Sequence, residues 1–203
     1  MADSTIFTGL AKVGGALGKG LIAGFAGTVA ITVSQMIEMQ ITNREASNAP
    51  VKVAGKALGV EPKGKAELEK EKNGREEPSE ETQQKVEENK QKFSEMMHFS
   101  YGTSWGVFRG ALDLAGIHGP VADLCHFSAV WGTAQVMLPA AAGTPPITQW
   151  SPKQIAIDAM HHAVYACAVG LTYDAMRKAE KRRISRRASW LDHLLSGNLK
   201  KPA

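Results

Sequence analysis

The sequence predicts an all-α fold: an integral membrane four-helix bundle with a charged, partly helical extramembrane loop. Three observations lead to this prediction. Four segments are mostly apolar and about as long as the roughly 20 residues that a helix needs to cross a bilayer. Small residues recur at four-residue intervals in three of these segments, as they do where membrane helices pack closely. The charge is concentrated in one long stretch, residues 43–96, and in a basic tail.

The average composition of the chain hides these segments. The 203 residues have a mean hydropathy of −0.20, which is typical of a soluble protein. That mean combines residues 43–96, with 11 Lys or Arg and 12 Asp or Glu, with apolar stretches at 20–42, 97–143 and 152–176. A soluble helical bundle is the competing interpretation. Because each glycine lowers helix stability in water, glycine-rich apolar segments of this length favour the membrane interpretation.

The first predicted transmembrane helix spans residues 20–42. It follows a Gly-rich lead-in, residues 1–19, that we expect to lie at the membrane interface. Gly20, Gly24 and Thr28 are four residues apart, so a neighbouring helix can approach this face closely. The apolar run is too long for a signal peptide and lacks a clear small-residue cleavage site, so we expect the helix to be retained.

The second predicted transmembrane helix, residues 97–117, follows the hydrophilic loop at residues 43–96. The middle of this loop has the composition of solvated chain, whereas its last part favours helix and can run directly into the second span. Gly102, Gly106 and Gly110 form a small-residue stripe along this span. Together with Gly24 of the first helix, this stripe is the strongest helix-packing signal in the chain.

Two more transmembrane helices are predicted in the second half of the chain. The third, residues 121–142, starts after a His-Gly-Pro turn and ends at a break rich in proline and glycine. The fourth spans residues 153–174. Ser151, Pro152 and Gln154 supply its N-cap, a proline at the first helical position and a glutamine at the third.

A basic tail, residues 175–203, follows the fourth helix. Seven Lys or Arg residues fall within residues 177–187, and cytosolic flanks of membrane helices are enriched in these residues. Four crossings place both termini on one side, so we expect both in the cytosol and the loop at residues 43–96 outside. The tail has no accompanying nucleic-acid-binding motif, so we expect no nucleic-acid partner.

Several short motifs resemble those of a known family. They are "GLIAG" at 20–24, "LPAAAGTPP" at 138–146, Trp150 and "DAMHHAVY" at 158–165. In this layout the chain resembles the YagU-like family of small bacterial inner-membrane proteins, over about half its length, mainly residues 97–178. The resemblance implies an integral, multi-pass protein of the bacterial inner (cytoplasmic) membrane. It brings no catalytic residue with it.

Three stretches place an acid three residues before a histidine: "EMMH" at 95–98, "DLCH" at 123–126 and "DAMH" at 158–161. Residues three apart share one face of a helix, and acid-x-x-His motifs on two helices build the metal site of some four-helix bundles. A spanning helix is about 30 Å long, so "DLCH" at the cytosolic end cannot meet the other two.

The predicted topology therefore gives two polar clusters. An outer cluster holds ligand types that suit Zn, Fe or Mn; its members are Glu38, Glu95, His98, Asp158, His161 and His162. An inner cluster lies at the cytosolic end; its members are Arg109, Asp113, His118, Asp123 and His126. Arg109 and Asp113 are four apart on one helix and can pair.

A structural role for these polar residues is favoured over a chemical one. Acids are stabilised near helix N-termini by the helix dipole, and histidines form hydrogen bonds between membrane helices. The dipole accounts for Glu95 and Asp123 better than for Asp158, which lies nearly two turns into its helix. A proton or ion path, a bound metal, and a haem held by His98 and His162 stay open as alternatives, although no cofactor is expected.

The favoured function is that of a non-enzymatic membrane protein, such as an accessory subunit of a membrane complex. The sequence has no nucleophile–base pair, phosphate-binding loop or dinucleotide fingerprint. Cys125 and Cys167 lie inside predicted helices and are expected to be buried thiols. The alternatives are a proton- or ion-conducting protein and a metal- or haem-binding redox protein. The expected partners are the lipid bilayer and either another membrane protein or a second copy of the chain.

Overall fold

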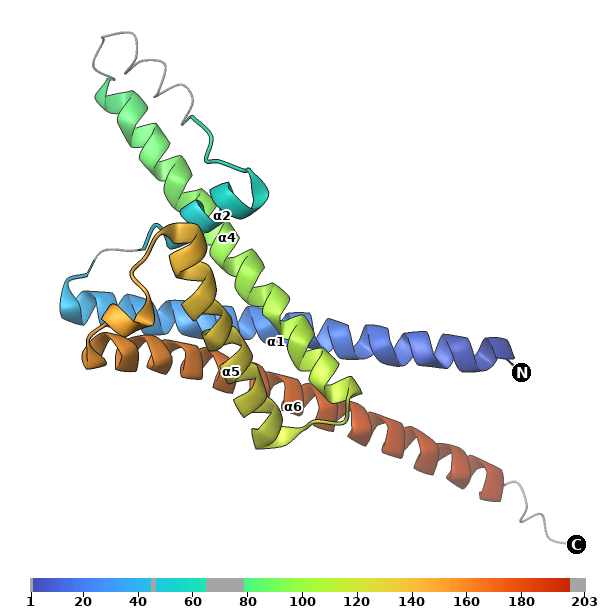
Figure 1. Ribbon diagram of the computed structural model, residues 1–203. Helices are drawn as coiled ribbons and strands as arrows, with labels where there is room; N and C mark the ends of the chain where they lie inside the picture. Colours follow the sequence, from blue (N-terminus) through green and yellow to red (C-terminus); the bar gives the residue numbers. More distant parts are fainter. Residues whose placement is uncertain (1, 45–46, 65–78, 198–203) are drawn as a thin grey trace, which may run out of the picture.

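The computed structural model describes residues 2–44, 47–64 and 79–197, and all regular secondary structure in these ranges is helical (Figure 1). The all-α prediction is therefore confirmed. The elements are α1 (Ala2–Thr42), α2 (Ala49–Leu58), α4 (Glu80–Leu114), α5 (Gly119–Met137), the π-helical turn η1 (Leu138–Ala142), the 3-10 turn η2 (Ile147–Gln149) and α6 (Pro152–Gly197).

Helix α1 joins the predicted lead-in to the first predicted span. Its 41 residues make a single helix about 60 Å long. Residues 5–15 are exposed and Ala16 is the first buried position among those described. The described part of the lead-in therefore belongs to the same helix as the first predicted span. It is a helical arm that extends beyond the rest of the fold at the N-terminal end (Figure 1).

The contact between α1 and α4 depends on small residues from both helices. A Cβ atom on Gly106 would lie 2.8 Å from the Cα atom of Gly24 and would overlap the carbonyl oxygen of Gly20. One on Gly110 would lie 2.6 Å from the carbonyl oxygen of Ala16. The two backbones are thus in direct contact, with α1 and α4 running in opposite directions. The structure puts the Gly102, Gly106 and Gly110 stripe at this crossing.

Helix α6 runs antiparallel to α1 and supplies most of the large side chains in the core. The core cluster holds Ala23 and Ile31 of α1, Val130 of α5 and three residues of α6: Tyr165, Val169 and Tyr173. Gly27 leaves room for the side chains of Tyr165 and Val169. This cluster is small for a chain of 203 residues.

The start of α6 follows the capping pattern expected from the sequence. The Ser151 backbone N–H donates to Gln154 Oε1 over 2.8 Å, and the Gln154 backbone N–H donates to Ser151 Oγ over 3.3 Å. These reciprocal bonds form a capping box, with Pro152 as the first helical residue. The predicted N-terminus of this helix is confirmed.

The charged stretch at residues 43–96 contains a helix that the sequence did not indicate. Helix α2 lies against the π-helical turn η1, where Lys56 Nζ donates to the carbonyl oxygen of Ala140 over 2.5 Å. The last part of the stretch forms the start of α4, which Ser79 caps by accepting from the Thr82 backbone N–H. Residues 45–46 and 65–78 of the stretch lie outside the described ranges.

Within the described part of the chain, two helices are long and apolar enough to cross a membrane. They span Thr5–Thr42 and Pro152–Leu195, and only 33% and 28% of their most apolar windows are buried inside the protein. The predicted spans at 97–117 and 121–142 fall largely within α4 and α5. Both are helical, but neither is among the helices that are long and apolar enough to cross a membrane by composition alone. Their crossing of a membrane therefore stays a prediction.

Candidate functional site: two polar clusters in an apolar bundle

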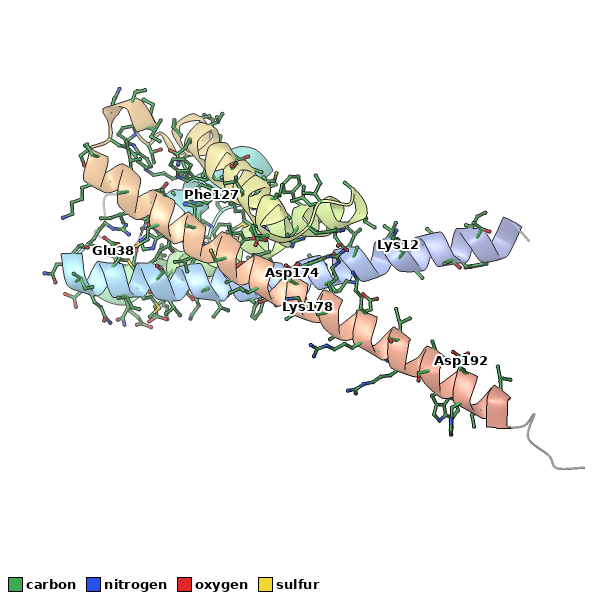
Figure 2. The ribbon with its side chains drawn as sticks, turned by 90° about the horizontal axis from the view of Figure 1, so that it is seen from below. Lys12, Glu38, Phe127, Asp174, Lys178 and Asp192 are labelled. Atoms are coloured by element: carbon green, nitrogen blue, oxygen red, sulfur yellow. The ribbon has the colours of Figure 1, made fainter. Side chains whose placement is uncertain are left out.

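Polar side chains gather at two levels along the helices. One level lies near Glu38 at the C-terminal end of α1, and the other lies near Asp174 in the middle of α6 (Figure 2). The first corresponds to the predicted outer cluster and the second to the predicted inner cluster. The structure changes the membership of both.

At the outer level, α1 and α6 are joined through His161. Its Nδ1 atom lies 2.8 Å from Ser34 Oγ, and its Nε2 atom lies 3.9 Å from Glu38 Oε2. The Glu38 carboxylate is held more closely by Arg44 Nη2 at 2.7 Å and Thr42 Oγ1 at 2.9 Å. Glu38 therefore has a full set of local donors, and Ser34 and Arg44 join the predicted members.

The order serine, histidine, acid in this group invites comparison with a hydrolase triad. A triad needs a carboxylate that hydrogen-bonds the imidazole and donors that stabilise an oxyanion beside the serine. The 3.9 Å between His161 and Glu38 is longer than a hydrogen bond. Ser34 lies inside helix α1, where backbone N–H groups are used by the helix. The Ser34–His161 contact is therefore a bond between helices.

The Asp158 carboxylate is hydrogen-bonded to α5, and of the other outer residues it lies near His162, whose Nδ1 atom is 3.7 Å from Asp158 Oδ2. The same Oδ2 atom accepts hydrogen bonds from Trp131 Nε1 over 2.8 Å and from Gln135 Nε2 over 3.1 Å. His162 Nδ1 contacts the backbone oxygen of Asp158 at 2.9 Å. Asp158 and His161 thus serve different helix contacts, although they are three residues apart.

Of the acid and the histidine in the "EMMH" stretch, only the histidine lies near another outer residue. Glu95 is exposed on α4 and accepts a hydrogen bond from Gln91 over 3.2 Å. His98 is half-buried, close enough to His162 for their charges to interact. Over residues 2–44, 47–64 and 79–197, no three His, Cys, Asp or Glu side chains are grouped so as to hold a metal ion. The six predicted residues are therefore not brought into one site.

At the inner level, Arg109 is fully buried between α4, α5 and α6. Its Nη2 atom donates to Asp174 Oδ1 over 2.9 Å, and its Nε atom lies 3.5 Å from Asp123 Oδ1. Its guanidinium also lies 4.6 Å from the centre of the Tyr173 ring. The expected pairing with Asp113 on the same helix is not formed, because these partners on other helices take its place.

Asp113 belongs to a second group one turn further along α4. It accepts a hydrogen bond from Tyr173 Oη over 3.0 Å, and its other oxygen lies 3.0 Å from both Arg177 Nε and His118 Nδ1. Tyr173 therefore connects the Asp113 group to the Arg109 group. Over the two groups, three carboxylates face two guanidinium groups and one imidazole, so the charges nearly balance.

His126 lies close enough to the inner level for the charge of Arg109 to act on its ring. Its side chain is fully buried between two aromatic rings, with ring centres 6.1 Å from Phe108 and 5.6 Å from Tyr165. Neither ring nitrogen has a hydrogen bond of good geometry with a described residue, although a backbone group of Trp105 lies near enough to interact with the ring. His126 therefore lies beside the inner cluster, enclosed by aromatic rings.

Three residues of α6 that the sequence does not assign to the inner level join it: Tyr173, Asp174 and Arg177. Tyr173 and Asp174 are the last two residues of the fourth predicted helix and Arg177 lies in the predicted tail, so the spacing of the acid-x-x-His motifs does not mark them. A signal was present, because an arginine inside an apolar helix needs an acid on a neighbouring helix. Asp174 was the acid at the end of the neighbouring apolar run.

Comparison of the chain with protein-family models, with curated proteins and with solved structures finds no match. The resemblance to the YagU-like family accordingly stays a prediction.

Proposed function

We propose that this chain is a non-enzymatic integral membrane protein of the bacterial inner membrane, such as an accessory subunit of a membrane complex. The observation that carries the proposal is the apolar surface of α1 and α6. Phe25 is 54% exposed and Leu171 is 74% exposed, although both lie within the most apolar parts of the chain. A core helix of a soluble protein would bury such side chains, whereas a bilayer covers them.

The small core supports the same proposal. Helices in a bilayer associate through close backbone packing and interhelical polar contacts, since lipid tails are as apolar as the side chains. The α1–α4 crossing at Gly106 and the Arg109–Asp174 pair are contacts of these two kinds. A soluble protein of this size would need a larger set of buried apolar side chains.

The proposed topology has four crossings with both termini in the cytosol. The N-terminal arm of α1 and the C-terminal end of α6 leave the bundle at the same end (Figure 1). Lys12, Lys19 and the basic residues of the tail lie at this end, which the positive-inside rule assigns to the cytosol. The charged stretch at residues 43–96 then faces outward.

The polar residues support a structural role. The carboxylates of Glu38, Asp158 and Asp174 each accept hydrogen bonds from neighbouring side chains. Side chains satisfied in this way fix the rotation of the helices about their axes.

Cysteine labelling from the two sides of the membrane tests the proposed topology. Reporters in the outward stretch and in the tail are expected to react from opposite sides, and reaction from one side would overturn it.

Proton or ion movement is a second candidate function, and His126 is the observation that favours it. Titratable side chains lie at both levels of the bundle, and His126 is a fully buried titratable group beside the inner level, with no hydrogen bond of good geometry from a described residue to either ring nitrogen. Histidines inside membrane helices can act as relay groups, because one ring nitrogen can accept a proton while the other donates one.

Replacing His126 with leucine is expected to abolish any proton flux that the reconstituted protein carries. Flux is measured in liposomes loaded with a pH-sensitive dye, after a potential is imposed. His162→Ala removes a relay candidate at the outer level, and His193→Gln in the exposed tail is the matched control. Flux no greater than in empty liposomes, or flux unchanged by His126→Leu, would remove this candidate function.

A further inference from the structure

The C-terminal part of α6, residues 178–195, lies outside the packed bundle, and we call it the C-terminal arm. Figure 2 shows Lys178 and Asp192 on a helix that extends past the other elements. Every residue of the arm is exposed. One ion pair, between Glu180 and Lys19 of α1, joins the base of the arm to the rest of the fold.

The arm carries an apolar face that the fold does not cover. Ile184, Ala188, Leu191 and Leu195 are spaced by four, three and four residues, so they line one side of the helix. Leu194 and Trp190 lie about 80° and about 120° around the helix from Ile184, on the flank that also carries Arg183 and Arg187. The large apolar side chains of the arm are all exposed: Ile184 63%, Trp190 61%, Leu191 44%, Leu194 46% and Leu195 67%.

The opposite side of the arm is strongly basic. Arg182 and Arg186 are four residues apart and lie opposite Ile184. Arg183 and Arg187 lie at the border of the apolar face, where an arginine can lay its stem along apolar surface and extend its guanidinium into a polar layer. A helix with this division of faces is typical of a segment that lies in the interface of a membrane.

Two polyanionic partners attract such a helix: a bilayer with anionic phospholipid and a nucleic acid. The apolar face decides between them. A tryptophan and three leucines have no role against a phosphate backbone, whereas they fit the boundary between headgroups and acyl chains. The arm also begins four residues after the predicted span ends at residue 174. At 1.5 Å per residue its base lies about 6 Å beyond that span.

We propose that the C-terminal arm binds the surface of a bilayer that contains anionic phospholipid. Its arginines bind lipid phosphates and its apolar face enters the boundary between headgroups and acyl chains. This inference rests on the proposed membrane location of the protein. It also requires the arm to bend away from the axis of the first half of α6 once the helix leaves the bilayer.

The experiment uses the full chain with Cys125 and Cys167 replaced by alanine and with Ala188→Cys as a reporter on the apolar face. An environment-sensitive fluorophore on this cysteine is compared in vesicles of phosphatidylcholine alone and in vesicles that also contain phosphatidylglycerol. With phosphatidylglycerol we expect blue-shifted emission and loss of quenching by iodide. Added salt is expected to reverse the blue shift and restore quenching by iodide. The same reversal is expected when glutamine replaces the four arginines of the arm: Arg182, Arg183, Arg186 and Arg187.

Three results would overturn the proposal. They are a fluorophore equally quenched in both vesicles, a fluorophore equally shielded in both, and a shift produced by added RNA but not by phosphatidylglycerol. Resistance of the same protein to alkaline carbonate extraction reports separately on membrane insertion. If insertion holds and the arm stays in water, only the lipid-binding proposal fails. If the protein is extracted, the proposed function fails with it.

Discussion

Replacing Gly106 with alanine is expected to destabilise the protein by about 1–3 kcal/mol, the range for an atom inserted into a packed contact. The added Cβ would overlap the carbonyl oxygen of Gly20 and would lie within 2.8 Å of the Cα atom of Gly24. Both obstacles are backbone atoms, so no side chain can rotate to make room. The helices α1 and α4 have to separate, and their contact is lost along its length.

Gly132→Ala is the matched control for this prediction. Gly132 also lies inside a helix, and nothing lies within 4 Å of the position of its Cβ. Alanine there should leave stability unchanged or raise it by about 0.5–1 kcal/mol, because glycine is the poorer helix former. Thermal unfolding of the two variants in the same detergent measures the difference. Equal midpoints for Gly106→Ala and Gly132→Ala would show that α1 and α4 do not pack as described.

Replacing Arg109 with glutamine is expected to cost about 3 kcal/mol of stability, at the lower end for breaking a buried ion pair. The Arg109 side chain is 0% exposed, and its loss leaves the carboxylates of Asp123 and Asp174 without their cation. The lower end applies because these carboxylates are 32% and 27% exposed, so solvent screens part of the penalty.

A second substitution separates this charge effect from a general loss of packing. Asp174→Asn in the Arg109→Gln background removes one unpaired carboxylate, so the double variant should be more stable than Arg109→Gln alone. Glu180→Gln breaks the exposed pair with Lys19 and should cost under about 1 kcal/mol. A double variant that is less stable than Arg109→Gln would contradict the buried pair.

The sequence predicted the parts of the fold that depend on local pattern. The Ser151 capping box follows from residue types at fixed offsets along one helix. The four-residue spacing of Gly102, Gly106 and Gly110 likewise marks a face for close packing before any neighbour is known. Both features are properties of a single helix, so one sequence is enough to find them.

The partners of the polar residues could not be predicted in the same way. Which acid meets Arg109 depends on how three helices are rotated about their axes, and sequence spacing gives no measure of that rotation. Asp158 and His161 illustrate the point, because they are near neighbours on α6 yet contact α5 and α1 respectively. Glu95 does not join the outer cluster as predicted. It lies on the part of α4 that precedes the packed bundle, where the residue is exposed.

The predicted first and fourth helices are shorter than α1 and α6 for a different reason. The predicted spans end at the thickness of a bilayer, but a helix continues until a residue stops it. No proline separates the lead-in from residue 20, and none separates residue 174 from the tail. Both α1 and α6 therefore run on as arms beyond the predicted spans.

The measurement that tests the membrane topology most directly is labelling of single cysteines with a membrane-impermeant maleimide in intact spheroplasts. Four exposed positions in a background without Cys125 and Cys167 serve as reporters: Gln84, Ala115, Thr148 and Ser189. Four crossings with cytosolic termini predict that the cysteines at 84 and 148 react at once, and that those at 115 and 189 react only after permeabilisation. Equal reactivity at all four positions, or a grouping of 84 with 189, would contradict the four-helix membrane bundle.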